Sequence, residues 1–380
     1  MPFNSLGLAP NILEAISAAN LYEPTPIQNQ AIPAVLANKD LLGIAKTGSG
    51  KTAAYVWPIL HRMQVAPASQ HREPTVLVLV PTRELAIQVQ ATFQAYIPAL
   101  KSRVICQAIH GGTSINPQMQ SIGRANILVA SPGRLLDLIE KNAIRLSSIS
   151  TLVLDEADKM LNSSFKDELD RILSLLPKNR QNLLFSATLN EPLSALQHLI
   201  LREPTIIKIS EATTETNLIQ QLGYLVSEEN KGPLLRYLIQ QNEHKQVLVF
   251  ASSAIKVDRI VNKLLKNKIH AAAIHSKISQ HARTYTLQQF KTGELHVLVA
   301  TDLLGRGIDI EHLPCVINYE LPRSPTDYIH RVGRTGRANA SGDAISLVSP
   351  TEMPHFKLIQ KKIETRIPLL HGDSINLHGC

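Results

Sequence analysis

Cysteine and aromatic residues are scarce in this chain, and each shortage excludes a class of protein. The three cysteines, Cys106, Cys315 and Cys380, lie far apart and form neither a disulfide framework nor a zinc-binding pattern. Aromatic residues make up 4% of the chain, and Trp57 is its one tryptophan. Recognition of nucleic acid by stacking bases on aromatic side chains is therefore not favoured.

Long apolar runs and blocks of like charge are also missing. The longest stretch without a charged residue, Val104 to Gly123, contains Gly111, Gly112 and Pro117, so it cannot span a bilayer. No basic residue precedes Lys39, and we expect no secretory signal and a cytoplasmic protein. The net charge of +8 is compatible with nucleic acid, but without a basic block such a site must be assembled by folding.

Short apolar runs alternate with helix-length segments along the 380 residues. Continuous apolar runs are typical of parallel strands that are buried on both faces of a sheet. Two series of such runs predict two α/β domains, each a parallel sheet with helices on both faces. The predicted strands are Leu41–Ala45, Val76–Val80, Ile127–Ala130, Thr151–Leu154, Leu183–Phe185, Val247–Phe250, Ala271–Ile274, Val297–Ala300, Val316–Tyr319 and Ala344–Val348. The polar stretch 210–217 is the predicted linker between a domain at 1–209 and one at 218–368, with a short tail at 369–380.

A glycine-rich loop follows the first predicted strand and precedes a helical segment. The backbone N–H groups of such a loop converge on phosphate oxygens, and the helix N-terminus adds partial positive charge. In this pattern Lys51 reaches the β- and γ-phosphates, and the Thr52 hydroxyl binds Mg²⁺. A turn that only joins strand to helix is the alternative, which the context makes the weaker one. The predicted nucleotide-binding residues here are Thr47, Gly48, Ser49, Gly50, Lys51 and Thr52.

An acidic cluster, Asp155, Glu156 and Asp158, follows the predicted strand Thr151–Leu154. Asp155 can hold Mg²⁺ at the strand end, and Glu156 can orient and deprotonate an attacking water. Acids this close together are costly in a buried site unless a cation neutralises them. A solvated acidic turn is the alternative for the tetrapeptide alone, but the phosphate loop upstream favours ATP hydrolysis.

Three arginines, Arg331, Arg334 and Arg337, stand at three-residue spacing near the end of the second predicted domain, with His330 before them. Guanidinium groups this close together favour an anion as partner. Arginine fingers stabilise the charge on a transferring phosphoryl group. A basic helix end that binds nothing in particular is the alternative.

Together these motifs resemble those of the DEAD-box RNA helicases, enzymes of superfamily two with two RecA-like domains. Asp155-Glu156-Ala157-Asp158 spells the family name, and the motifs follow the family order over residues 1–350. Several positions depart from the family pattern. Asn20-Leu21 replaces glycine and an aromatic residue, His275-Ser276-Lys277 replaces His-Gly-Asp, and Leu304-Gly305 replaces two alanines.

The resemblance implies a role for each motif residue. In a Q motif at 1–30, Gln28 would read the adenine edge and Phe3 would stack on the base. Gly307 and Asp309 would also bind the nucleotide, with Asp309 at its ribose. Catalysis would involve Lys51, Asp155, Glu156, His330, Arg334 and Arg337, with Arg334 and Arg337 as fingers and with Thr52 and Asp155 as Mg²⁺ ligands. Coupling between the domains would involve Asp158, Ser186, Thr188 and Arg331.

A second group of segments resembles the track along which the family holds the RNA backbone. Small residues, hydroxyl groups, helix N-termini and arginines are the groups that contact phosphates, and these segments offer all of them. Read singly, each is most often a turn or a helix cap. The predicted RNA contacts are Pro81, Thr82, Arg83, Gly112, Pro132, Gly133, Arg134, Gln280, Arg283 and Thr301. Because no base-reading element is visible, we expect little sequence preference.

The sequence therefore predicts an ATP-dependent RNA helicase that uses ATP and Mg²⁺ and separates short duplexes locally or remodels RNA–protein complexes. ATP and RNA are expected to bind across the two domains, whose closure completes the ATPase site. We expect a monomer without membrane association, with ribosome assembly or RNA decay as possible settings. An ATP-gated RNA clamp and a DNA-directed translocase are the two alternatives.

Overall fold

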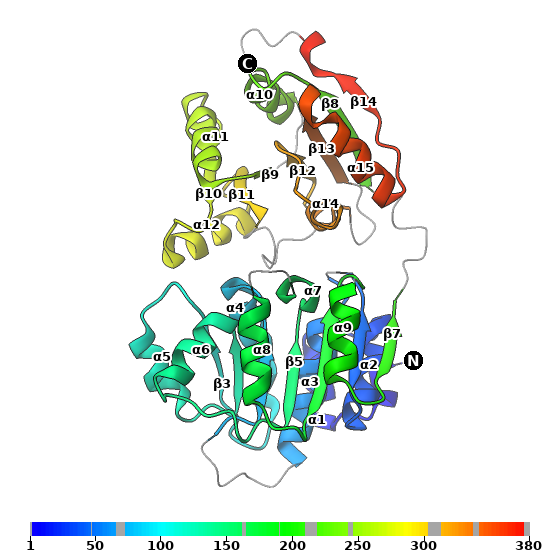
Figure 1. The fold of residues 1–380 in the computed structure, drawn as a ribbon, viewed down its shortest axis with the longest axis vertical. Coiled ribbons are helices and arrows are strands. Elements are labelled where there is room, and N and C mark those ends of the chain that lie inside the picture. Colours follow the sequence, from blue (N-terminus) through cyan, green and yellow to red (C-terminus); the bar gives the residue numbers. More distant parts are fainter. Residues whose placement is uncertain are drawn as a thin grey trace. The chain divides into compact units, whose positions relative to one another are not determined.

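The computed structural model describes residues 2–46, 48–65, 73–161, 165–189, 191–209, 219–241, 246–302, 313–336 and 342–375. The chain divides into two compact units, Met1–Ser210 and Glu211–Cys380, called the first and second unit below. Each unit has its own sheet with helices on both faces (Figure 1). Thr47, Gly307, Asp309, Arg337 and the predicted linker at 210–217 lie outside the described residues.

Seven strands form the sheet of the first unit, in the order β3–β4–β2–β5–β6–β1–β7. All six neighbouring pairs are parallel, as the uninterrupted apolar runs predict. The strands are β1 (Leu41–Ile44), β2 (Val76–Leu79), β3 (Cys106–Ile109), β4 (Ile127–Ala130), β5 (Thr151–Leu154), β6 (Gln181–Ser186) and β7 (Thr205–Lys208).

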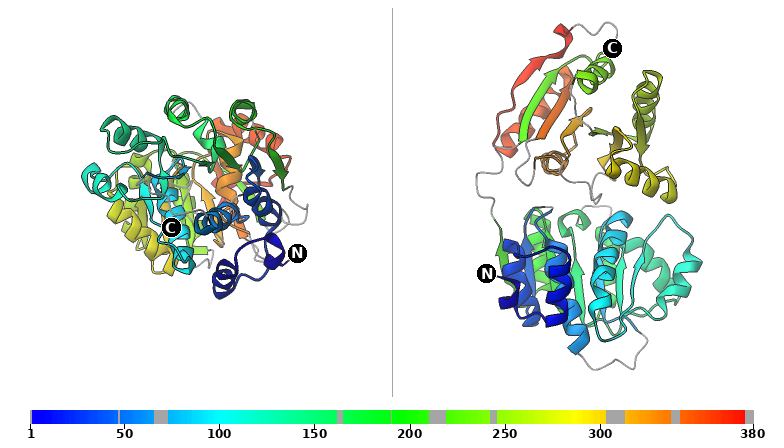
Figure 2. Two further views of the ribbon diagram at one scale, coloured as in Figure 1. Left: turned by 90° about the horizontal axis from the view of Figure 1, so that it is seen from below. Right: turned by 180° about the vertical axis from the view of Figure 1, so that it is seen from behind.

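Helices cover both faces of this sheet because successive side chains of a strand point to opposite faces. Val76 and Val78 of β2 pack with α1–α4, whereas Leu77 and Leu79 pack on the opposite face with α5–α9. Figure 1 has α8 and α9 in front of the sheet, and the view from behind in Figure 2 has α1–α3 in front. The helices are η1 (Phe3–Leu6), α1 (Pro10–Ala18), α2 (Pro26–Leu36), α3 (Lys51–Val65), α4 (Arg83–Tyr96), η2 (Ile97–Ala99), α5 (Ile115–Ile122), α6 (Pro132–Glu140), α7 (Ala157–Met160), α8 (Lys166–Leu175) and α9 (Glu191–Ile200).

The second unit repeats this architecture with a different sequence. Its parallel strands follow the order β10–β11–β9–β12–β13–β8–β14, with α10 and α11 on one face and α12, α14 and α15 on the other. The strands are β8 (Ile219–Leu225), β9 (Val247–Ala251), β10 (Ala271–Ile274), β11 (Val297–Thr301), β12 (Cys315–Asn318), β13 (Gly342–Val348) and β14 (Leu369–His371). The helices are α10 (Lys231–Gln241), α11 (Ala254–Lys266), α12 (Gln280–Thr292), α14 (Pro325–Val332), η4 (Pro350–Glu352), α15 (Met353–Ile363) and η5 (Gly372–Ser374).

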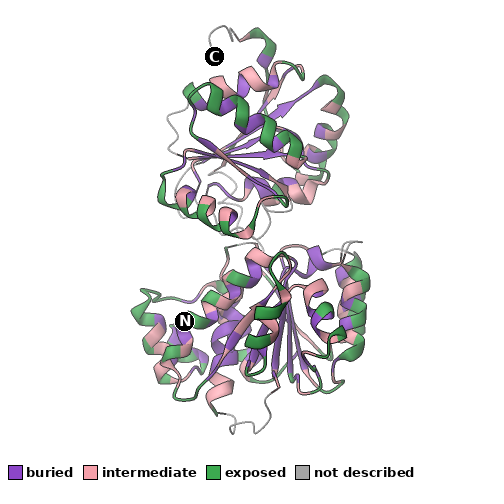
Figure 3. Cartoon of the chain, turned by 90° about the vertical axis from the view of Figure 1, so that its left-hand side faces the viewer, coloured by how far each residue is buried: buried purple, intermediate pink, exposed green. Residues whose placement is uncertain are grey.

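Burial follows the layers of each unit, with buried strands and helices that expose their outer faces (Figure 3). Every strand predicted from the sequence is present, but β3, β7, β8 and β14 were not predicted. The tail predicted at 369–380 is wrong in its first part, because Leu369–His371 forms β14 and pairs with β8. Asp373 then accepts hydrogen bonds from Ser227 and Asn230, which ties this segment to the second unit. Among the described helices, none has the length and apolar character that crossing a bilayer requires.

Candidate nucleotide and RNA site

The carboxyl ends of the strands carry the motifs of the first unit, and the strand order sorts these motifs into two groups. In a parallel sheet these ends lie along one edge. The phosphate loop follows β1, Asp155 follows β5 and Ser186 ends β6, and these three strands are neighbours. The predicted RNA segments follow β2, β3 and β4, which form the other half of the sheet. The predicted nucleotide residues and the predicted RNA residues of this unit are therefore adjacent groups that meet between β5 and β2.

Lys51 begins α3, and its ammonium group lies within the phosphate loop. Its Nζ donates to the carbonyl oxygens of Ala45 at 2.5 Å and Lys46 at 2.8 Å, and the residue is 8% exposed. Burial lowers the pKa of Lys51, while the nearby carboxyl groups of Asp155 and Glu156 oppose that shift. An ammonium group has three N–H donors, and two of them bind the loop in this way.

Gln28 connects the predicted Q motif to the phosphate loop. Its Nε2 donates to the Gly50 carbonyl at 3.2 Å, and its Oε1 accepts from the Thr25 N–H at 3.0 Å within the capping box of α2. Gly50 has a φ of +88°, and a Cβ atom there would lie 2.3 Å from the Gln28 Nε2, so glycine is required. An amide offers two N–H groups and two acceptor lone pairs, so these two hydrogen bonds use half of its four hydrogen-bonding positions.

Asp155 is 3% exposed at the end of β5, and two groups fix its carboxyl group. The Tyr55 hydroxyl donates to Oδ2 at 2.8 Å, and the Glu156 N–H donates to Oδ1 at 2.9 Å. Burial raises the pKa of Asp155, and the Lys51 ammonium opposes this. Burial, with the Asp155 charge as a further cause, raises the pKa of Tyr55 well above its usual range, so this hydroxyl stays a donor.

Glu156 adopts a backbone conformation that non-glycine residues rarely take. Its φ of +53° and ψ of +46° lie in the left-handed region, which costs about 1–2 kcal/mol for an L-residue. Strain of this kind persists where the surroundings hold the residue, and it is concentrated at functional sites. The Glu156 carboxylate forms an ion pair with Lys159, three residues further along α7, with Oε2 and Nζ 2.8 Å apart.

Asp158, Ser186 and Thr188, predicted to couple the domains, lie together in the first unit. The Thr188 hydroxyl donates to the Asp158 Oδ2 at 3.0 Å, and the Ser186 hydroxyl donates to the Thr188 carbonyl at 2.8 Å. The end of β6 is thereby tied to the acidic segment after β5. These contacts connect two nucleotide motifs within one unit, and the predicted coupling between the units stays a prediction.

Two predicted RNA-binding arginines converge on the loop that follows β3. A Cβ atom on Gly112 would lie 1.8 Å from the Arg83 Nη1, and the φ of Gly112 is +80°. The Arg134 Nη2 donates to the Thr113 carbonyl at 2.9 Å. Burial lowers the pKa of His110 in the same loop, and the charges of Arg83 and Arg134 lower it further. The loop therefore lies between two guanidinium groups.

Two helix starts in this region carry residues that are predicted to contact RNA. Thr82 caps α4, its Oγ1 accepting from the Leu85 N–H at 3.3 Å, and the buried Pro81 precedes it. Pro132 and Gly133 begin α6. The carboxylate of Glu168, on α8, accepts a hydrogen bond from the Gly133 N–H, so an acid of the chain lies at this helix start.

In the second unit, Arg331 joins the ends of three strands. Its guanidinium group donates to both carboxylate oxygens of Asp302, at 2.5 and 2.7 Å, and to the Asn318 Oδ1 at 2.9 Å. It also donates to the Glu320 carbonyl at 2.6 Å and lies 4.9 Å from the centre of the Phe250 ring. Each of these contacts lies inside the second unit, so a structural role is evident beside the predicted coupling role.

The remaining predicted residues of this unit are spread over several of its elements. His330 is on α14, and Arg334 follows this helix and is 3% exposed. Thr301 ends β11, next to Asp302. Gln280 begins α12, where its Nε2 donates to the Thr284 hydroxyl, but Arg283 on the same helix is 1% exposed. Such burial favours a packing role for Arg283, and its predicted RNA contact stays a prediction.

Phe3 lies in the hydrophobic core. It is 6% exposed, and its ring meets Trp57 edge-on, with ring centres 5.3 Å apart and planes at 82°. A ring buried to this extent leaves little surface for adenine, so the structure favours packing over the predicted stacking. Asn20, in contrast, retains what the usual glycine provides, because its φ is +59°.

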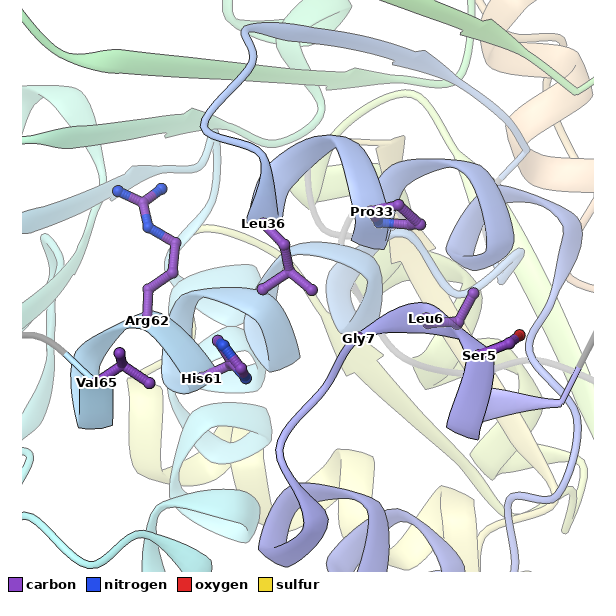
Figure 4. A pocket seen from close by; sticks show the side chains of 8 residues that line it. All are labelled: Ser5, Leu6, Gly7, Pro33, Leu36, His61, Arg62 and Val65. Atoms are coloured by element: carbon purple, nitrogen blue, oxygen red, sulfur yellow. The ribbon is translucent and has the colours of Figure 1, made fainter.

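A surface pocket lies elsewhere in the first unit. Its walls come from η1 and from the last turns of α2 and α3 (Figure 4). The phosphate loop precedes the opposite end of α3, which is about 20 Å long at 1.5 Å per residue. The pocket is therefore separate from the phosphate loop. The lining residues are Ser5, Leu6, Gly7, Pro33, Leu36, His61, Arg62 and Val65.

Sequence reasoning missed several contacts of the site. Tyr55 is one helical turn after Lys51 and Lys159 is three residues after Glu156, so helical spacing could have revealed both. Glu168 gave no such signal, because its contact with Gly133 joins two different helices.

Comparison with known proteins identifies the family. Residues 25–196 match the DEAD/DEAH box helicase family, and residues 230–339 match the helicase conserved C-terminal domain. The ATP-dependent RNA helicase CshA of Listeria monocytogenes is 37% identical over 371 residues, which cover 97% of this chain and 70% of that protein. The CshA protein of Bacillus subtilis is 36% identical over 366 residues, covering 96% of this chain and 73% of that protein.

Solved structures agree with this match. Saccharomyces cerevisiae Dbp5 bound to RNA and ADP BeF3 superposes with a TM-score of 0.86 at 30% identity, covering 98% of this chain and 96% of that one. Mss116p bound to ssRNA and AMP-PNP gives a TM-score of 0.89 at 26% identity, covering 98% and 79%. The chain has two parallel sheets and a phosphate loop beside an Asp-Glu-Ala-Asp segment. Together with these matches, this shows that the chain belongs to the DEAD-box family of ATP-dependent RNA helicases.

Proposed function

We propose that this protein uses RNA-stimulated ATP hydrolysis to separate short RNA duplexes locally or to remodel RNA–protein complexes. The observation that carries the proposal is the layout of the first unit, where the nucleotide motifs and the RNA motifs occupy adjacent halves of one sheet edge. A structural change at the nucleotide motifs can therefore affect the RNA motifs through a shift of neighbouring strand ends.

In the nucleotide half, Lys51 and the N–H groups of the loop bind the phosphates, and Gln28 favours adenine. Glu156 acts as the general base, because it follows Asp155 in the Asp-Glu-Ala-Asp segment and the turn after β5 fixes its backbone. Water attacks the γ-phosphorus while the bond to the leaving ADP oxygen breaks, and Glu156 takes the proton that the water loses.

Mg²⁺ fits the residues present. The buried Asp155 carboxyl group stands beside Lys51 and has oxygen lone pairs beyond the two bonds it accepts, and Thr52 lies on the same helix as Tyr55. In the described part of the chain no group of three or more His, Cys, Asp or Glu residues could hold a metal. Asp155 and Thr52 would hold the ion. When bound, Mg²⁺ neutralises developing phosphate charge.

In the RNA half, Arg83, Arg134 and the starts of α4 and α6 hold the sugar–phosphate backbone. Contacts of this kind position a strand without reading its bases, so little sequence preference is expected. Discrimination of RNA from DNA then depends on the 2′-hydroxyl groups. We propose the cytoplasm as location, and ribosome assembly or RNA decay as settings for a monomeric enzyme.

Arg334 supplies the finger that acts on the γ-phosphate. It belongs to the second unit, whereas the phosphate loop and Glu156 belong to the first, so hydrolysis depends on both units. Because the predicted RNA contacts are also divided between the units, we propose that RNA binding promotes the catalytic arrangement. This accounts for stimulation of hydrolysis by RNA.

Strand release from a short RNA duplex tests the proposal. With ATP and Mg²⁺, the full chain should release one strand of a labelled duplex of about ten base pairs, and Glu156→Gln should bind ATP and RNA but release nothing. An RNA clamp would bind the duplex with ATP and leave it paired. A DNA-directed translocase would show ATP turnover that DNA stimulates as strongly as RNA.

A further inference from the structure

We propose that Lys159 is a positioning residue for the Glu156 carboxylate during ATP hydrolysis. This inference rests on the proposed role of Glu156 as the general base. Lys159 Nζ lies 2.8 Å from Glu156 Oε2, and the two side chains are 7% and 11% exposed. Both groups are thus held in the interior of the site, where a charge pair is screened far less than at the surface.

The charges around this pair explain why Glu156 needs a cation of its own. The charges of Asp155, Glu156, Asp158 and Lys159 all act on Lys51, so this region holds two ammonium groups and three carboxyl groups. Phosphates bound at Lys51 add negative charge to the same region. Lys159 is then the cation that stays with the Glu156 carboxylate.

The geometry gives the pair a positioning effect. The backbone of Glu156 is fixed at a left-handed φ of +53°, and its N–H donates to the Asp155 carboxyl group. The carboxylate is three side-chain torsions away from that backbone, and the ion pair with Lys159 restrains them. Without Lys159 the carboxylate would turn away from Asp155 and Asp158, because like charges repel, and would leave the position from which it takes the proton of water.

The test compares Lys159→Met, which keeps the chain length and removes the charge, with Lys159→Arg, which keeps the charge. ATP turnover with saturating single-stranded RNA should fall about tenfold in Lys159→Met, as part of the 10²–10⁴-fold that a positioned base contributes. The KM for ATP should stay within about twofold, because the phosphates are bound elsewhere, and Lys159→Arg should recover most of kcat. Lys141→Met, at an exposed lysine after α6, is the matched control.

A double variant separates positioning from general damage. In the Glu156→Gln background, Lys159→Met should change the residual rate by less than about twofold, because the group that it positions is gone. An equal fall in both backgrounds, or a Lys159→Met enzyme with wild-type kcat, would overturn the inference. Should Lys159→Met not fold, Lys159→Gln set against Lys159→Arg gives the same comparison. A wild-type chain without RNA-stimulated turnover would instead refute the proposed function itself.

Discussion

Replacing Phe3 by alanine separates two roles for this residue. The family resemblance predicts that Phe3 stacks on adenine, whereas the structure buries it against Trp57. Truncation of a buried phenylalanine destabilises a protein by about 3–5 kcal/mol, of which the aromatic pair contributes about 0.5–1.5 kcal/mol. We expect a loss near the lower end, about 3 kcal/mol, because Phe3 belongs to the short helix η1, whose backbone can adjust.

Trp57 is the one tryptophan of the chain, so its fluorescence reports on the first unit alone. In urea, a loss of about 3 kcal/mol shifts the unfolding midpoint by about 1 M when the slope is about 3 kcal/mol per molar. Phe3→Leu, which keeps most of the volume, should lose less than about 1.5 kcal/mol. Tyr22→Ala removes an aromatic side chain that is 68% exposed and should stay within about 0.5 kcal/mol of wild type.

The KM for ATP decides between the two roles. The structure predicts that Phe3→Ala, measured well below its unfolding temperature, keeps this KM within about twofold. An unchanged unfolding midpoint together with a KM raised about tenfold would refute the packing role and restore the adenine contact.

Three further predictions test other contacts. Gly112→Ala places a Cβ atom 1.8 Å from the Arg83 Nη1 at a φ of +80°. Affinity for single-stranded RNA should therefore fall about tenfold, while affinity for ATP is kept. Gly111→Ala, where nothing lies within 4 Å of the added Cβ atom, should change neither affinity. Arg331→Met leaves Asp302 without its buried guanidinium partner and should destabilise the second unit by about 3–5 kcal/mol. Urea unfolding followed by circular dichroism measures this loss. Arg323→Met, at an exposed site, should not destabilise the unit. Gln28→Ala should lower the preference for ATP over GTP in competition assays, and a wild-type enzyme that uses both equally would contradict the adenine contact.

The sequence predicts those strands whose complete burial requires apolar residues at every position. Strands covered on both faces need continuous apolar residues, and β2, β4 and β9 are recognisable for this reason. The strand β8 escaped recognition because Gln220, Gln221 and Gly223 interrupt its apolar pattern. The edge strands β3, β7 and β14 are short and partly exposed, and they carry a weaker pattern.

The site shows the same division. The motif residues and their order along the chain were predicted, because phosphate and metal chemistry restrict which side chains can serve. Pairings between distant positions were not predicted. The bond of Tyr55 to Asp155 spans a hundred residues of sequence, and the contact of Arg83 with Gly112 depends on β2 and β3 being placed on either side of β4. The adjacency of nucleotide and RNA motifs likewise follows from the strand order, which the sequence does not display.

Steady-state ATP turnover of the full chain, with and without single-stranded RNA, tests the central claim most directly. Turnover should be low alone and rise by at least about tenfold with RNA, but not with DNA of the same sequence. Arg334→Ala should lose this stimulation while its ATP affinity stays within a few-fold, since an arginine finger contributes roughly 10³–10⁵ in rate. Turnover that RNA leaves unchanged, or an Arg334→Ala enzyme that keeps its full stimulation, would contradict the account.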